Sequence, residues 1–336
     1  MIKIGLAGCG FMGDMHAACY RALAELGVQV TAVADVRPEF AKKLADTYGA
    51  KLFDTAEDMI ENADVDVIDI CLPTHLHAKL AVQAMKKGRD VFLEKPVCIR
   101  EDEMELLLAT ERETGSKVQV GQVIRLWDEY AWLKGVTARG EFGKFRSGVF
   151  QRLSAKPTWA SNGWLHKAEL SGGVAVDMHV HDVDFVRYLL GDPDTVQAVA
   201  SRDADGVIQE ISAVYGYGKD VAVSVEAGWD YPAAFPFTAT YRVRFEKAAV
   251  TFAGGAVTVY PYDGEPYQPK IEAQYHGDNA VGGNISSLGG YYNELKYFIE
   301  GIKGEHPLEI ATLEEAIKSV RLVKKEIETT GGLVAK

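Results

Sequence analysis

The first third of the chain alternates short apolar runs with segments of helical periodicity. Ile2–Ala7 and Val28–Ala34 predict buried strands, and Phe11–Leu26 and Pro38–Tyr48 predict the helices that follow them. The alternation continues with strands at Val65–Ile70, Asp90–Leu93 and Val118–Val120, and with helices at His75–Lys87 and Glu101–Thr114. Strands that alternate with helices at this spacing are typical of βαβ units and a parallel sheet.

The pattern changes after residue 122, where apolar–polar alternating runs follow one another directly. Short turns such as Gly218–Asp220 and Gly254–Gly255 separate them. Consecutive strands joined in this way are typical of a largely antiparallel sheet. The predicted strands are Gly143–Leu153, Thr195–Ala200, Ile211–Tyr217, Val221–Ala227, Thr238–Phe245, Ala248–Phe252 and Val257–Tyr260.

Helical patterns interrupt and close this second region. Helices are predicted near Val174–Leu190, at Tyr291–Lys303 and at Leu313–Thr329, and a loop at Gly277–Gly290. A chain of 336 residues is too long for one ordinary core. We therefore expect an α/β domain with a doubly wound parallel sheet at residues 1–122. An α+β domain should follow at residues 123–336, an open, mostly antiparallel mixed sheet with helices on one face, and the C-terminal helices can pack back on the first domain.

Composition and charge narrow the class of protein. The chain has 47% hydrophobic and 25% charged residues, and 36 basic against 48 acidic residues give a net charge of −12. Basic residues do not cluster, so we expect no nucleic-acid partner. We also expect no signal peptide and no membrane span, since the start is patterned as a strand and no apolar run is long enough. The four cysteines lie within the first 98 residues and form no CxxC pair, which favours reduced thiols and a cytoplasmic location.

A glycine motif lies between the first predicted strand and helix. Gly8, Gly10 and Gly13 form G-x-G-x-x-G, a weak signal by itself in a chain with 33 glycines. The strand before it and the helix after it make it a dinucleotide-binding turn, with the helix N-terminus facing the pyrophosphate. The alternatives are an ordinary strand–helix turn and FAD binding.

A carboxylate follows the next predicted strand at the position that distinguishes dinucleotides. Asp35 can accept hydrogen bonds from the ribose hydroxyls and would repel a 2′-phosphate, which favours NAD over NADP. Arg37, two residues further on, could tolerate a phosphate.

Glu94, Lys95 and Pro96 follow the strand Asp90–Leu93. Ligands of doubly wound sheets bind at the carboxyl ends of the strands, so Lys95 is expected at the cofactor edge. A lysine there can stabilise negative charge that develops on a substrate oxygen. The alternative interpretation is a surface lysine before a turn proline.

One predicted helix of the second region carries a narrow polar stripe. At about 100° per residue, Asp177, His181, Asp184 and Tyr188 share one side of an otherwise apolar helix. Burying these groups together is costly unless they are paired or face a polar cavity, so the stripe is a candidate site. The alternative is an Asp–His pair satisfied within the core. His179 lies off the stripe and ranks below His181.

His75 and His77 form an HxH pair at the start of a predicted helix, where alternate residues diverge. No third ligand lies at a persuasive spacing, so we predict no metal site. His16 is interpreted as a helix-face residue of the first βα unit.

These motifs together resemble the glucose–fructose oxidoreductase, inositol dehydrogenase and MocA-like family. The matching segments are GCGFMG, Asp35, Pro73-Thr74-x-x-His77, Glu94-Lys95-Pro96, Gly172-Gly173 with Asp177-x-x-x-His181, Tyr292-x-Glu294-Leu295-x-x-Phe298 and the helix after Pro307. The resemblance spans nearly the whole chain. It implies a Rossmann domain followed by an open sheet used partly in oligomer contacts.

The resemblance also implies a reaction, namely hydride transfer between NAD and a secondary alcohol or carbonyl of a sugar, inositol or related polyol. It implies that Lys95 polarises the reacting oxygen, that His181 is the general acid/base, and that Asp177 binds substrate and supports the proton transfer. Relatives often carry a small residue where His179 stands. No metal is implied. The alternatives are a glycosidase that uses NAD transiently and a non-enzymatic NAD-responsive regulator; the presence of both Lys95 and His181 argues against the second.

The motif and the resemblance together define the residues expected at the site. The expected cofactor contacts are Gly8, Gly10, Phe11, Met12, Gly13, Asp35, Val36, Arg37, Leu72, Thr74, His77, Glu94, Lys95 and Gln122. The expected substrate-specificity residues are Arg125, Trp127, Gln151, Trp164 and Tyr291. We expect a homodimer or homotetramer formed through the C-terminal sheet.

Overall fold

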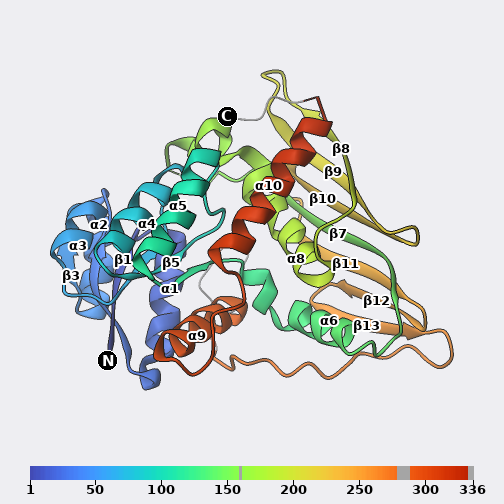
Figure 1. The fold of residues 1–336 in the computed structure, drawn as a ribbon, viewed down its shortest axis with the longest axis horizontal. Helices are drawn as coiled ribbons and strands as arrows, with labels where there is room; N and C mark the ends of the chain where they lie inside the picture. The colour runs from blue at the N-terminus through green and yellow to red at the C-terminus, as the bar shows by residue number, and fades with distance from the viewer. Residues whose placement is uncertain (159–160, 278–287, 332–336) are drawn as a thin grey trace. The chain divides into compact units, whose positions relative to one another are not determined.

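The computed structural model describes residues 1–158, 161–277 and 288–331 (Figure 1). The chain divides into two compact units, Met1–Leu126 with Ala273–Ile317, and Trp127–Glu272 with Lys318–Lys336. The sequence predicts a single boundary at residue 122. In the structure each unit consists of two segments, because Ala273–Ile317 belongs to the first unit and the residues after it belong to the second. The first unit therefore includes a helix, within Ala273–Ile317, that is far from the rest of the unit in sequence.

The first unit contains a parallel sheet of six strands in the order β3-β2-β1-β4-β5-β6, which confirms the doubly wound arrangement. Its strands are β1 Ile2–Ala7, β2 Val28–Ala34, β3 Lys51–Phe53, β4 Val67–Ile70, β5 Asp90–Leu93 and β6 Val118–Val120. Its helices are α1 Phe11–Ala22, α2 Pro38–Tyr48, α3 Ala56–Asn62, α4 His77–Lys86, α5 Glu101–Thr114 and α9 Gly289–Lys303, with 3₁₀ turns at Ala24–Leu26, Thr74–Leu76 and Val123–Leu126.

Local chemistry sets the ends of these helices. Proline begins α2, and Gly49 ends it in the left-handed conformation that glycine adopts without strain. The short β3 and α3 were not predicted. Thr55 caps α3 by accepting a hydrogen bond from the Asp58 amide at 3.1 Å.

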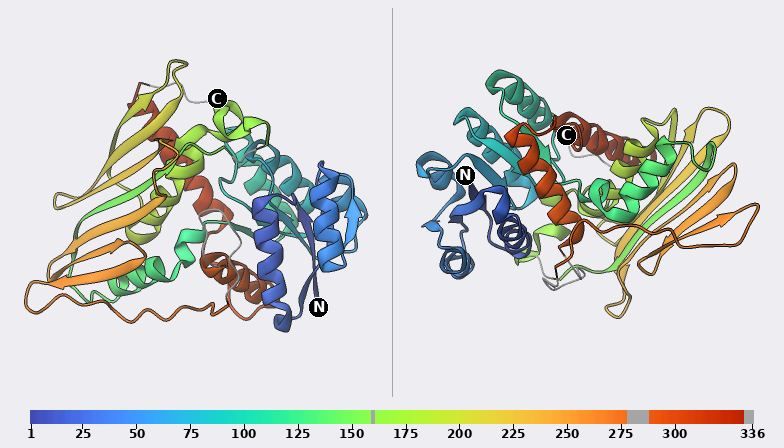
Figure 2. Two further views of the ribbon diagram at one scale, coloured as in Figure 1. Left: turned by 180° about the vertical axis from the view of Figure 1, so that it is seen from behind. Right: turned by 90° about the horizontal axis from the view of Figure 1, so that it is seen from below.

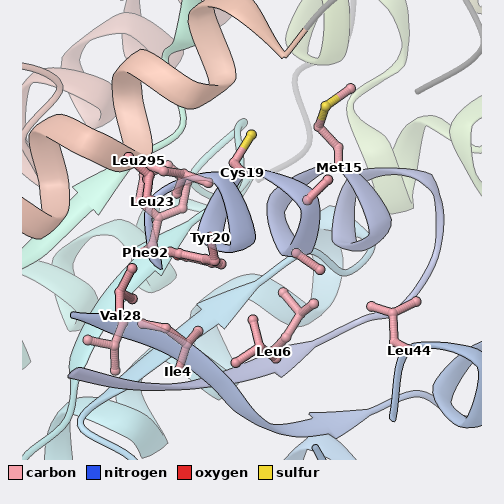
Figure 3. Packing of buried hydrophobic residues seen from close by; sticks show 14 of the residues in the cluster. Ile4, Leu6, Met15, Cys19, Tyr20, Leu23, Val28, Leu44, Phe92 and Leu295 are labelled. Carbon is pink, nitrogen blue, oxygen red and sulfur yellow. The ribbon is translucent and has the colours of Figure 1, made fainter. Parts of the chain in front are cut away.

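The core of the first unit joins α1 and the sheet to α9. Leu295, Phe298 and Ile299 of α9 are buried against residues of α1 and β5 (Figure 3). The rings of Phe92 and Phe298 meet edge to face with centroids 5.3 Å apart. This packing makes α9 part of the first unit.

The second unit contains a sheet of seven strands in the order β13-β12-β11-β7-β10-β9-β8. β7 and β10 run parallel and the other neighbours run antiparallel, which confirms the predicted mixed sheet. The strands are β7 Phe145–Ala155, β8 Thr195–Arg202, β9 Ile208–Tyr217, β10 Val221–Tyr231, β11 Thr238–Phe245, β12 Ala248–Ala253 and β13 Ala256–Pro261. The helices are α6 Asp128–Ala138, α7 Ala168–Ser171, α8 Val180–Leu190 and most of α10 Leu313–Thr329, with a 3₁₀ turn at Ser161–His166.

Helices cover one face of this sheet (Figure 2). The helix α6 was not predicted. Its Tyr130 ring packs edge to face on Phe185 of α8 and on Tyr241 of β11, with ring centroids 4.8 and 5.2 Å apart. The side chains that alternate with these inward residues include small and polar ones, as at Ser224 and Thr251, and exposed apolar ones, as at Val199 and Val214. Among the described helices, none is both long and apolar enough to cross a membrane.

The predicted helix Val174–Leu190 is not regular throughout. It begins with a π-helical turn at Ala175–His179, and α8 follows from Val180. A wider turn changes the angle between successive side chains, so the even spacing assumed for the polar stripe is wrong here. Of the predicted loop Gly277–Gly290, residues 278–287 lie outside the described residues, and α9 begins at Gly289.

The packing of α9 on the rest of the first unit leads to a stability prediction. Phe298→Ala should lower the free energy of unfolding by about 3–5 kcal/mol, because it removes a fully buried ring and leaves a cavity. Urea denaturation followed by tryptophan fluorescence and circular dichroism measures this loss. The control Leu106→Ala, on the exposed side of α5, should change stability by less than about 0.5 kcal/mol. Equal effects of the two substitutions would contradict the assigned packing.

Candidate functional site

The turn from β1 to α1 requires glycine at two positions for steric reasons. Gly8 has a φ of +96°, and a Cβ there would lie 2.3 Å from the carbonyl oxygen of Cys71. A Cβ on Gly13 would lie 1.9 Å from the carbonyl oxygen of Gly8. These two glycines let α1 lie directly on the end of β1.

Gly10 differs from the other two because its neighbourhood is open. A Cβ there would meet only the tip of the Arg37 side chain, at 3.2 Å. Gly10 also stands at the N-terminus of α1, which no described side chain caps. The space in front of Gly10 and the uncapped amides fit a phosphate group, which the helix dipole also favours.

Asp35 follows β2 and lies beside this turn. Its carboxylate accepts hydrogen bonds from the Cys9 amide at 2.8 Å and the Arg37 amide at 2.9 Å, and the Arg37 guanidinium donates to both oxygens at 3.1 Å. Burial alone would raise the pKa of Asp35, but the hydrogen bonds from Arg37 and Cys9 hold it below its ordinary value. Asp35 is therefore ionised at neutral pH and close to the glycine turn.

Other predicted contacts follow the strands β4, β5 and β6, whose carboxyl ends share one edge of the sheet. Thr74, Glu94 and Gln122 are buried there, and Lys95 is half-buried. The Thr74 hydroxyl and both amide atoms of Gln122 make no hydrogen bond with any described residue. Buried polar atoms in this condition need a ligand or ordered water, which fits a cofactor edge.

Predicted residues of the turn itself vary in exposure. Phe11 and Val36 are exposed, and Met12 and Leu72 are half-buried. Phe11 and Met12 belong to the glycine turn, and Val36 and Leu72 come shortly after β2 and β4.

His77 is buried next to the loops that follow β4 and β5 at this edge of the sheet. Its ring is buried, with Nδ1 2.8 Å from the Pro96 carbonyl oxygen and Nε2 2.7 Å from the Leu72 carbonyl oxygen. Burial lowers the pKa of His77. Each ring nitrogen lies at hydrogen-bonding distance from a backbone carbonyl oxygen, so His77 lies between the loops after β4 and β5.

In the second unit, the residues of the predicted polar stripe differ in burial. Asp177 and His181 are half-buried, whereas Asp184 is buried and accepts a hydrogen bond from Ser319 Oγ at 2.7 Å. Asp184 is thus a core partner of α10, and its place in the predicted stripe was wrong. Tyr188 is half-buried and lies under the Lys134 ammonium, 4.4 Å from its ring centroid.

His179 has a partner in the core of the second unit. Its Nε2 lies 2.8 Å from Glu326 Oε2 of α10, and the Tyr215 hydroxyl donates to the other carboxylate oxygen. This network holds the π-helical turn against α10 and β9.

Arg152 and Asp182 form a second buried pair, which was not predicted. Arg152 Nε donates to Asp182 Oδ2 at 2.8 Å between β7 and α8. The sequence contained a signal for this pair. Arg152 comes two residues after Phe150 in the strand, so both side chains face the inward side and the arginine needs a buried partner.

The predicted substrate residues do not share one surface of the second unit. Gln151 points away from Arg152 because successive strand residues face opposite sides, and its amide donates to Glu226 at 2.6 Å. It therefore lies on the face opposite to α8. Trp127 lies near Arg152, at 5.8 Å from ring centroid to guanidinium carbon, and Trp164 is half-buried in a 3₁₀ turn.

Arg125 and Tyr291 belong to the first unit. Arg125 is buried in the 3₁₀ turn Val123–Leu126, and the Tyr291 ring lies 6.3 Å from that of His16. Tyr291 is thus placed near the carboxyl edge of the sheet.

The six-stranded sheet with its glycine turn and Asp35 defines a dinucleotide-binding fold of the NAD-binding oxidoreductase class. The family model described as an oxidoreductase family with an NAD-binding Rossmann fold matches residues 2–122. The model of the GFO/IDH/MocA C-terminal domain matches residues 130–251. The chain belongs to this family, as its motifs suggested, and NAD is its cofactor.

The similar proteins include inositol 2-dehydrogenases, a levoglucosan dehydrogenase and uncharacterized oxidoreductases. Inositol 2-dehydrogenase of Rhizobium meliloti (strain 1021) is 29% identical over 208 residues, 62% of this chain and 61% of that protein. Levoglucosan dehydrogenase of Pseudarthrobacter phenanthrenivorans is 28% identical over 212 residues, 60% of this chain and 54% of that protein. The aligned part therefore spans less than two thirds of either relative.

A solved structure of levoglucosan dehydrogenase in complex with NADH and levoglucosan has a TM-score of 0.82 with this chain. It covers 98% of this chain and 97% of that one at 21% identity. At this identity the likeness shows the fold.

The three glycines should differ when each is replaced. Gly13→Ala should destabilise the protein by about 2–3 kcal/mol, because the new methyl group overlaps backbone that must move. Gly10→Ala should change stability by less than about 1 kcal/mol and weaken NAD⁺ binding at least about tenfold, because its methyl group occupies the space in front of the turn. Urea denaturation and calorimetric titration with NAD⁺ measure the two effects. Unchanged NAD⁺ affinity in Gly10→Ala would place the dinucleotide elsewhere.

Proposed function

We propose that the protein is an NAD-dependent dehydrogenase that oxidises a secondary alcohol of a sugar, inositol or related polyol. One observation carries the proposal: Asp177 and His181 stay half-accessible, whereas Asp182, Asp184 and His179 on the same segment are buried in pairs. A helix that buries its other ionisable groups and keeps one acid and one imidazole partly accessible supports a proton-transfer role for those two.

The first unit supports the cofactor part of the proposal. The glycine turn, the ionised Asp35 and the buried polar atoms of Thr74 and Gln122 fit the phosphates, ribose and nicotinamide side of a dinucleotide. Bound NAD⁺ would supply the hydride acceptor for the reaction.

Lys95 is assigned the role of stabilising charge on the reacting oxygen. It is half-buried directly after Glu94, whose carboxylate accepts the Lys95 amide at 3.1 Å. The following Pro96 carbonyl is held by His77. An ammonium group on a segment fixed at both ends can lower the energy of a developing alkoxide.

His181 is assigned the role of general base, and Asp177 supports it one turn earlier. In the oxidation, the hydroxyl O–H bond of the substrate breaks and its proton goes to His181. The hydrogen on the substrate carbon leaves as a hydride with both electrons of its bond, for which bound NAD⁺ would be the acceptor, and the substrate C–O single bond becomes a carbonyl. In the reverse direction His181 returns the proton.

An absorbance screen tests the reaction class. The protein with NAD⁺ and a panel of sugars, inositols and sugar acids should produce NADH with at least one member of the panel. Release of a sugar from a glycoside with no net NADH would instead identify the NAD-using glycosidase. No turnover of either kind, together with thermal stabilisation by NAD⁺, would identify a regulator and refute the dehydrogenase.

Two substitutions test the residue roles. Lys95→Ala and His181→Ala should each lower kcat by about 10²–10⁴-fold with NAD⁺ affinity retained, because both groups act on the reacting oxygen and its proton. The matched control His75→Gln, an exposed imidazole of the 3₁₀ turn Thr74–Leu76, should leave kcat within about twofold. Loss of NAD⁺ affinity in both variants, with turnover of the bound complex unchanged, would refute these roles.

Cofactor preference depends on Asp35. Asp35→Ser should weaken NAD⁺ binding about tenfold and strengthen NADP⁺ binding, because it removes a carboxylate that repels a 2′-phosphate and frees Arg37 to bind that phosphate. Titrations with both dinucleotides measure the change, with the exposed Val36→Ala as control. NADP⁺ affinity that stays at the wild-type value would contradict the assigned role of Asp35.

A further inference from the structure

Four ionisable side chains of the first unit meet in its interior. They are His16 of α1, Asp69 of β4, Glu94 after β5, and Glu294 of α9. His16 and Asp69 are 0% exposed, Glu94 is 6% and Glu294 is 1% exposed. Three acids and one imidazole are thus buried together, which is costly unless their charges are compensated.

One side of the His16 ring is fully bonded. Nδ1 lies 2.9 Å from Asp69 Oδ2, and the Tyr20 hydroxyl donates to the same oxygen at 2.9 Å. A carboxylate on Nδ1 favours a hydrogen on that nitrogen. Burial lowers the pKa of His16, but the Asp69 carboxylate raises it well above its ordinary value, so a metal ion at Nε2 would replace a proton there. Histidines that bind metals are supported by a carboxylate in the same way.

The other side of the ring faces two further carboxyl groups. Nε2 lies 3.2 Å from Glu94 Oε1, and ligand atoms of His16, Glu94 and Glu294 lie within 4.8 Å of one another. Among the described residues, His16 Nε2, Glu94 Oε1 and both carboxylate oxygens of Glu294 have no hydrogen-bond partner. The unsatisfied atoms of this cluster therefore point to one shared space.

A proton or a cation could compensate the charge. Burial, and then the charge of Glu94, raise the pKa of Glu294 well above its ordinary value, which by itself favours a proton. A single proton on Glu294 can be shared with only one neighbouring acceptor, either His16 Nε2 or Glu94 Oε1, and leaves the other unsatisfied. A cation satisfies the imidazole and both carboxylates at once.

We propose that His16 Nε2, Glu94 and Glu294 bind one divalent metal ion. One imidazole and two carboxylates suit ions such as Zn²⁺ or Mn²⁺. Cys71 lies on the other side of the ring, with Sγ 3.2 Å from Nδ1, and is not a ligand in this assignment. The ion would connect α1, the end of β5 and α9, and so hold α9 in the first unit. No metal site was predicted from the sequence, because His75 and His77 have no third ligand at a persuasive spacing and His16 was interpreted only as a helix-face residue.

Metal binding is tested on the whole protein without NAD. The protein is treated with EDTA, dialysed, and titrated with Zn²⁺ and separately with Mn²⁺ by calorimetry. We expect about one ion per chain and a rise of about 4 °C or more in the thermal unfolding midpoint. Absence of uptake at about 1 mM of either ion would overturn the proposal in favour of a proton or a water molecule at this place.

Variants locate the ion. Glu294→Gln and His16→Gln should each weaken binding at least about 30-fold, because each removes a ligand or its charge. Glu326→Gln replaces an equally buried glutamate of the second unit and should leave affinity unchanged. Cys71→Ala should also retain binding; loss there, or wild-type affinity in Glu294→Gln, would overturn the assigned ligands. Circular dichroism shows which variants are folded, and the wild-type stoichiometry does not depend on them.

Discussion

The contact of the Gly13 backbone with the carbonyl oxygen of Gly8 is the constraint on which the first unit depends. No side-chain carbon fits between them, so α1 lies directly over the end of β1. The helix N-terminus is thereby placed at the carboxyl edge of the sheet, beside Asp35. The same placement brings His16, about one turn further along α1, next to Asp69 of β4. The anion-binding turn and the buried polar cluster are therefore consequences of one close approach.

Much of the fold could be predicted because the hydrophobic periods are regular where elements are long. The apolar runs of β1, β2 and β5 and the helical pattern of α5 correspond to elements with the predicted bounds. β3 has three residues and α3 has seven, too few for either period to stand out. The π-helical turn could not be predicted either, because tertiary contacts such as that of His179 with Glu326 hold it in place.

The candidate site could be predicted where its residues lie in local motifs. The glycine turn, Asp35 and the segment around Lys95 are each recognisable within a few residues. Gln151 shows the limit of this reasoning, since the strand's alternation turns it to the face opposite Arg152. The cluster of His16, Glu94 and Glu294 draws on three separate segments, and the packing of α9 on α1 brings Glu294 to the other two.

The first unit is discontinuous, since Ala273–Ile317 returns to it after the whole second sheet. The second sheet is in this sense an insertion within a nucleotide-binding domain. A fragment that stops at residue 126 would lack α9 and would expose Phe92 and the apolar side of α1. The second unit also includes Lys318–Lys336, so its exchange between relatives, by evolution or by design, requires three junctions in the gene, after Leu126, Glu272 and Ile317.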